Sequence, residues 1–168
     1  IESIMRSYAM QMVGDIDIIT TGTTDKASEG LDEVTSMRIL GCTMSDQTEY
    51  VRDETNYNYC FEESISVESY SDYETAKDLG ILPDSIEIDD NTCVVTRGYA
   101  DTFGVAEGDT ITLDTRDEET IELQINKIID ISNQIIDDNT VIVSNEVERR
   151  IACVPSLDYS IWLINVDD

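Results

Sequence analysis

Apolar and β-branched residues alternate with polar residues in many short segments of this chain, and such alternation predicts β-strands. The pattern favours strands over residues 15–20, 37–44, 60–68, 92–96, 109–115, 120–131, 140–143 and 159–166. The charged residues 116–119 separate two of these segments, so we expect a β-hairpin there. Residues 46–58 are polar with few apolar positions, which predicts a loop or a short helix.

Helical spacing of apolar residues and helix-capping residues predict three or four short helices. Residues 1–12 carry apolar side chains at helical spacing. Ser71 and Gly80 bracket a helix over 72–79, Gly104 ends one over 98–103, and Ser144 can cap one over 145–153. The elements together predict an α+β fold, with a mixed, mostly antiparallel sheet and a small β-barrel-like hairpin module.

The length and apolar content suit one domain. The chain has 168 residues, 40% of them hydrophobic, so it can bury a core of its own. We expect a single domain over 1–168, with residues 92–143 as a strand–helix–hairpin subdomain. The longest apolar run, Ile161–Ile164, is far short of the roughly 20 residues that cross a bilayer. Because the chain starts at Ile1 without a methionine, we expect it to be part of a longer protein.

The net charge and the amino-acid composition exclude several kinds of partner and of catalytic chemistry. The formal net charge is −27, so the surface repels phosphate backbones and anionic headgroups, and we expect no nucleic-acid partner. The chain contains no histidine, which excludes Ser-His-Asp and Cys-His nucleophile systems and histidine-ligated metals. The acidity is typical of a domain that faces outward from a cell, although adaptation to high salt or binding of divalent cations are alternatives.

Two carboxylates are the strongest candidates for catalytic chemistry. Asp15 and Asp17 are two residues apart in a predicted strand, so both project from the same face, about 7 Å apart. Burial could separate their pKa values for acid–base work, but a solvent-facing strand edge is the favoured interpretation of the pair. The acidic runs, such as 117–119, do not follow the spacing of a calcium-binding loop, which favours solvated turns.

The cysteines and tyrosines are less specific. Cys42, Cys60, Cys93 and Cys153 are widely spaced, which disfavours zinc ribbons and thioredoxin-like chemistry. Cys42 and Cys60 could form a disulfide outside the cell, and the sequence does not fix the pairing. The tyrosine-rich part of the chain is either a partner-contact patch or the wet rim of a thin core. The candidate contact residues are Tyr57, Tyr59, Tyr70 and Tyr73.

The segment Val94–Leu113 has the most characteristic pattern in the chain. It reads as a strand, one short helix, a glycine stop and a tight turn into a hairpin. Gly104 and Gly108 can adopt positive φ, and the carboxylate of Asp109 can accept hydrogen bonds from nearby amides. These three residues are therefore structural turn residues rather than catalytic ones.

These motifs, in their order, resemble the extracytoplasmic domain of FtsX-like, MacB-type ABC transporter permeases. Gly14–Ile19 resembles the family's first strand, and Val94–Leu113 its strand–helix–turn motif. Ile125–Asp130 and Val141–Ser144 resemble the two strands that follow, except that Ile129 replaces a family glycine. The resemblance covers about residues 1–20 and 92–166.

The resemblance implies a domain on the extracytoplasmic side of a cell membrane. The domain would be inserted between two membrane-spanning segments, which anchor it to the membrane. It implies a cytoplasmic ATPase subunit as partner, dimerisation of the full transporter, no cofactor or metal on this domain and no enzymatic activity. Its role would be to couple conformational change in the membrane to substrate or partner engagement during export. The two chain ends should then leave the domain on the same face. The alternatives are a secreted carboxylate-based hydrolase and a cation-dependent interaction module.

Overall fold

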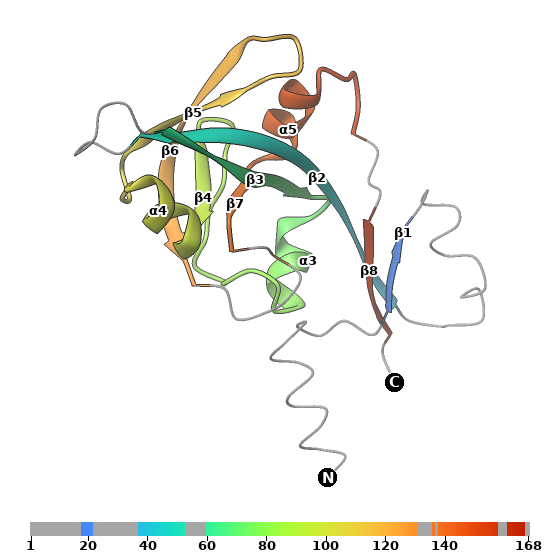
Figure 1. Ribbon diagram of the computed structural model, residues 1–168. Coiled ribbons are helices and arrows are strands. Elements are labelled where there is room, and N and C mark those ends of the chain that lie inside the picture. The colour runs from blue at the N-terminus through green and yellow to red at the C-terminus, as the bar shows by residue number, and fades with distance from the viewer. Residues whose placement is uncertain are drawn as a thin grey trace.

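A computed structural model describes residues 18–21, 37–52, 60–130, 136, 138–157 and 161–166. These residues form one mixed sheet of eight strands in the order β1-β8-β2-β3-β7-β4-β6-β5, together with three short helices (Figure 1). The strands are β1 (Ile18–Thr21), β2 (Met37–Arg52), β3 (Cys60–Tyr70), β4 (Thr92–Thr96), β5 (Thr110–Asp114), β6 (Thr120–Ile129), β7 (Thr140–Ile142) and β8 (Ile161–Val166). The helices are α3 (Tyr73–Asp78), α4 (Arg97–Phe103) and α5 (Asn145–Ala152). The predicted α+β class is confirmed.

Most neighbouring strands run antiparallel. The pairs β3–β7 and β4–β6 are the two parallel ones among the described strands. β2 is the longest strand: its first part, Met37–Cys42, pairs with β8, and its second part, Cys42–Arg52, pairs with β3. In Figure 1, β2 runs as one long curved strand between these two regions.

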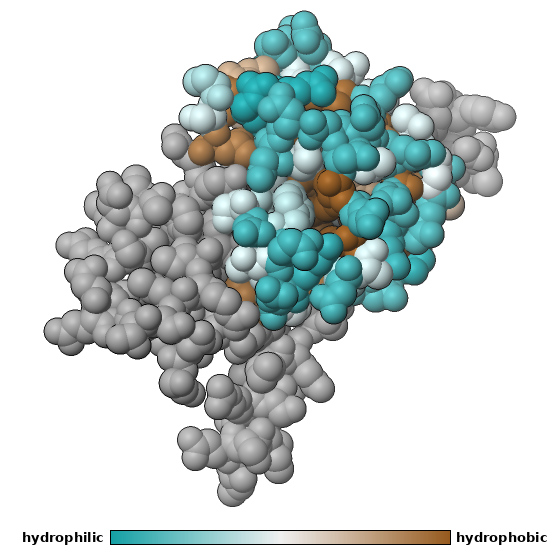
Figure 2. All heavy atoms as spheres, turned by 180° about the vertical axis from the view of Figure 1, so that it is seen from behind, coloured by the Kyte–Doolittle hydropathy of each residue, from teal (hydrophilic) through white to brown (hydrophobic). Residues whose placement is uncertain are grey.

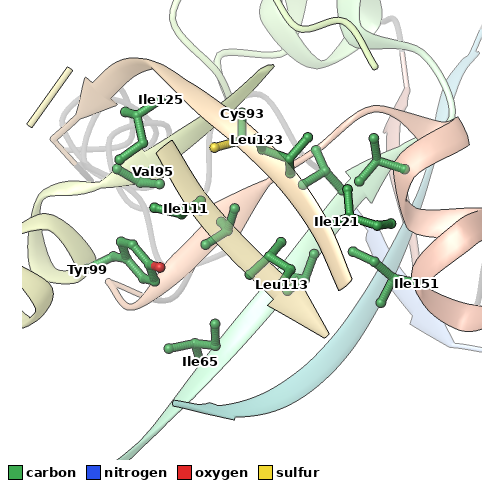
Figure 3. Packing of buried hydrophobic residues seen from close by; sticks show 14 of the residues in the cluster. Ile65, Cys93, Val95, Tyr99, Ile111, Leu113, Ile121, Leu123, Ile125 and Ile151 are labelled. Atoms are coloured by element: carbon green, nitrogen blue, oxygen red, sulfur yellow. The ribbon is translucent and has the colours of Figure 1, made fainter. Parts of the chain in front are cut away.

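The larger buried cluster lies inside the curve of the sheet. β5 and β6 alternate, with Ile111, Leu113, Ile121, Leu123 and Ile125 buried and the residues between them exposed. Figure 3 shows these side chains packed with Ile65 of β3, Tyr99 of α4 and Ile151 of α5. The alternation of apolar and polar residues that predicted this hairpin therefore matches the alternation of buried and exposed side chains.

A second buried cluster covers the opposite face of the central strands. Val94 of β4 and Ile142 of β7 point into it, whereas their neighbours Val95 and Val141 point into the first cluster. Both faces of β4 and β7 are thus buried, which explains why their sequences are continuous apolar runs. α3 and the connector that follows it complete the second cluster.

Two expectations about individual elements were wrong. Residues 46–52, predicted as loop or short helix, are the end of β2 and pair with β3 from Cys60 to Ser66. Hydrogen bonding to a neighbouring strand outweighs the weak local preference of a polar segment. The N-cap of α3 is Asp72 rather than Ser71, and its carboxylate accepts hydrogen bonds from the N–H groups of Glu74 and Thr75. The predicted helix over 1–12 lies outside the described residues.

Candidate functional site

Helix α4 joins strand β4 to the turn before β5, and the sequence fixes both of its ends. The hydroxyl of Thr96 accepts a hydrogen bond from the N–H of Tyr99 and caps the start. Gly104 has φ +65° and ends the helix in the left-handed conformation, which glycine adopts without strain. The N–H of Val105 then donates to the carbonyl of Ala100, 3.1 Å away.

The turn that follows is built by Gly108 and Asp109. Gly108 has φ +92°, and its N–H donates to the carbonyl of Ile125 at 2.8 Å. The Asp109 carboxylate accepts from the N–H of Ala106 at 2.8 Å, and the Glu107 carboxylate accepts from the N–H of Ile128 at 3.1 Å. Each of these two carboxylates accepts a hydrogen bond from a backbone N–H group. Both side chains therefore stabilise the shape of the turn.

A bulge in the β4–β6 ladder holds the connector between α3 and β4. The register skips Asn126 between Cys93 and Val94. The Asn126 side-chain amide donates to the carbonyl of Glu87 at 2.7 Å, and the Lys127 ammonium donates to the Ser85 hydroxyl at 3.0 Å. The bulge thus turns polar side chains of β6 toward the connector and fixes it.

The predicted tyrosine patch is not formed by its described members. Tyr70 is fully buried in the second cluster, where its hydroxyl donates to the Glu68 carboxylate at 3.0 Å. Tyr73 is half-buried against Tyr70 and donates to the carbonyl of Val143. The expectation that Tyr70 contacts a partner was wrong, because a residue at the end of a strand and before a helix packs between them. Tyr57 and Tyr59 lie outside the described residues.

The register of β2 with β3 shows whether Cys42 and Cys60 can form a disulfide bond. Cys42 pairs with Tyr70 and Cys60 pairs with Arg52, so the two cysteines lie at opposite ends of this ladder. At about 3.3 Å per residue their Cα atoms are some tens of ångströms apart, far beyond the roughly 7 Å limit of a disulfide. A bond between them within one chain is therefore excluded.

The other two cysteines occupy contrasting environments. Cys93 is fully buried in the first cluster, and burial raises the pKa of its thiol to about 12. Cys153 is exposed just after α5, in the left-handed conformation with φ +55°. The pair therefore provides one protected and one accessible thiol.

Two shallow hollows lie on the described part of the molecule. One of about 270 Å³ lies between α3 and the connector, lined by Tyr73, Lys77, Ile86 and Ile88 among others. Another of about 140 Å³ lies beside the β5–β6 turn and includes Asp117 and Arg150. Both are smaller than the roughly 300–1,000 Å³ typical of ligand pockets. Seen from behind, the described surface is mostly hydrophilic with small apolar areas (Figure 2).

The predicted catalytic and cation-binding residues are not brought into a described site. Asp15 and Asp17 lie outside the described residues. Within the described part of the chain, no three acidic or cysteine side chains come together in a way that could hold a metal ion. None of the helices described has the length and apolar character needed to cross a membrane.

The first and last described strands are neighbours. β1 pairs antiparallel with β8, with Ile18 opposite Ile164 and Thr21 opposite Ile161. The chain therefore enters β1 and leaves β8 at the same end of this strand pair, although the two strands are far apart in the sequence (Figure 1). Local sequence patterns predicted both strands, but nothing in them indicated that the two would pair.

Comparison with known proteins identifies the fold. No protein-family model matches the sequence, and no curated protein sequence matches it either. Among solved structures, the periplasmic region of MacB from Actinobacillus actinomycetemcomitans superimposes with a TM-score of 0.52 at 10% identity, over 88% of this chain. This chain spans 66% of that region, just under two thirds.

A domain described as part of a permease protein from Porphyromonas gingivalis aligns with a TM-score of 0.47 at 14% identity, over 88% of this chain and 69% of that domain. The superposition on MacB is the one that bears on the architecture. The chain has the fold of the MacB periplasmic region, as the order of its sequence motifs predicted.

Proposed function

We propose that this chain is the extracytoplasmic domain of an ABC transporter permease, inserted between two membrane spans of a longer protein. In this role it is a single, non-enzymatic domain over residues 1–168, and it binds no cofactor. It couples conformational change in the membrane to substrate or partner engagement during export. Its partners are a cytoplasmic ATPase and a second permease copy.

The pairing of β1 with β8 carries this proposal. A domain inserted between two spans needs both chain ends at one place, and Ile18 and Ile164 are opposite each other in the ladder. Strand pairing holds these ends together directly rather than through a loop. The fold shared with the MacB periplasmic region supports the same assignment.

The charge and the surface are consistent with this position. A domain with a net charge of −27 is repelled by anionic headgroups, so it stands away from the membrane to which its ends are anchored. The described acidic side chains of the β5 turn bind backbone amides, and the described hollows are small. These features favour a mechanical or docking role over catalysis.

Purification of the full-length protein in mild detergent tests this function. We expect it to carry, or to co-purify with, an ATPase that has a Walker-type phosphate-binding loop, and the complex to hydrolyse ATP. As a control, alanine in place of the Walker lysine should abolish hydrolysis and leave the complex assembled. A full-length protein that is monomeric, lacks such a loop and recruits no ATPase would contradict the proposal.

A further inference from the structure

Strand β2 changes its partner in the middle of its length. Met37–Cys42 pairs with β8 on one side, and Cys42–Arg52 pairs with β3 on the other. Within the described strands, Cys42 alone has partners in both ladders, Ile161 and Tyr70. The ladder of β2 with β8 and the ladder of β2 with β3 therefore overlap at a single residue. Few backbone hydrogen bonds then resist bending of the sheet at this point.

A glycine stands directly beside this junction. Gly41 is paired with Trp162 of β8 and precedes Cys42. Glycine in the interior of a strand weakens it and often marks a bend, because it has no side chain to pack and a wide range of backbone angles. A one-residue overlap also occurs at Gln124 of β6, between its ladders with β5 and β4, but residues of the first buried cluster lie on both sides of it and pack together there. At Cys42 the overlap coincides instead with Gly41, the one glycine in the described strands.

The junction separates two parts of the fold. The first, which we call the terminal sheet, consists of β1, β8 and residues 37–42 of β2, and it holds both described ends of the chain. The second, the body, consists of the rest of β2, β3 to β7 and the three helices. Both described buried clusters lie in the body. Figure 1 shows β8 and β1 beside one end of the curved β2, away from α4 and the β5–β6 hairpin.

We propose that residues 41–43 form a hinge about which the body turns as a unit relative to the terminal sheet. The two buried clusters keep the body rigid, whereas the single-residue overlap lets the backbone of β2 absorb the change in angle. The hinge is a property of the chain itself and does not depend on the proposed function. If that function holds, the hinge is the joint between the anchored ends and the rest of the domain.

Distances between spin labels test the hinge on the whole 168-residue chain. Cys42, Cys60 and Cys153 are replaced by serine, and the buried Cys93 is kept. Labels at Asn165→Cys and Glu122→Cys span the junction, and labels at Glu87→Cys and Glu122→Cys lie within the body as the control. Double electron–electron resonance should give a distance distribution at least about twofold broader for the first pair.

Substitution of the glycine provides the second arm. Gly41→Val should narrow the distribution across the junction and leave the body pair unchanged, since a β-branched residue restricts the backbone. Gly41→Ala should have a smaller effect in the same direction, and it keeps the test informative if the valine variant does not fold. Equal widths for the two pairs in the parent chain, or no narrowing in a folded Gly41 variant, would overturn the hinge. Neither result depends on a membrane or an ATPase.

Discussion

The carboxylate of Asp138 accepts a hydrogen bond from the backbone N–H of Gly98, 3.1 Å away and forty residues earlier in the chain. A Cβ atom on Gly98 would lie 1.9 Å from the carbonyl oxygen of Asp138. Beside this contact, the Thr96 hydroxyl accepts a hydrogen bond from the N–H of Thr140 at 3.1 Å. The start of α4 is thus locked onto the segment that leads into β7, and glycine is required because the two backbones touch.

This contact predicts a large cost for a small side chain. Gly98→Ala should lower the free energy of unfolding by about 3 kcal/mol, because neither backbone can move away without losing hydrogen bonds. Gly104→Ala is the matched control: its φ is +65° but nothing lies within 4 Å, so about 1 kcal/mol of backbone strain is expected. Urea unfolding measures both. A loss for Gly98→Ala no greater than that for Gly104→Ala would contradict the close approach.

The turn before β5 supplies a second prediction. Gly108→Val should lower the free energy of unfolding by about 1–3 kcal/mol, since Gly108 has φ +92° and a β-branched residue is strained there. Ala106→Val, at an exposed position of the same turn, should change it by less than about 0.5 kcal/mol. Thermal melts of the two variants give the comparison, and an unchanged melt for Gly108→Val would show that the turn is different.

Burial of the Cys93 thiol predicts a dependence of stability on pH. Its pKa is raised from 9.0 to about 12 in the folded chain, so the unfolded chain loses this proton first as pH rises. The contribution of the neutral Cys93 thiol to the free energy of unfolding is fully present below pH 9. Above pH 9 the free energy of unfolding decreases by up to about 1.4 kcal/mol per pH unit. Cys93→Ala lacks this group, so the stability difference between parent and variant should shrink between pH 9 and 11. Parallel pH curves for the two proteins would contradict a buried thiol.

The acidity predicts a general response to salt rather than a calcium site. Sodium chloride should raise the melting temperature, because screening weakens repulsion within a chain of net charge −27. Millimolar calcium chloride, compared with sodium chloride at the same ionic strength, should give the same melting temperature within error. An additional rise of several degrees with calcium would instead support the cation-dependent interaction module.

The sequence predicted local features of the fold well and non-local ones poorly. The alternation from Thr120 to Ile129 and the end of a helix at Gly104 depend only on residues close together in the sequence. The hairpin and α4 could therefore be predicted. The polar end of β2 was missed because it becomes a strand through pairing with β3. The burial of Tyr70 and the separation of Cys42 from Cys60 likewise depend on a register that no local pattern specifies.

The sidedness of the domain in intact cells tests the central claim most directly. In the full-length protein, all cysteines except Cys153 are replaced, and cells are treated with a maleimide that does not cross membranes. The matched protein keeps Cys93 alone, which is fully buried and should react only after denaturation. We predict that Cys153 is labelled in intact cells as completely as after lysis. Labelling of Cys153 only after the cells are broken would contradict an extracytoplasmic domain.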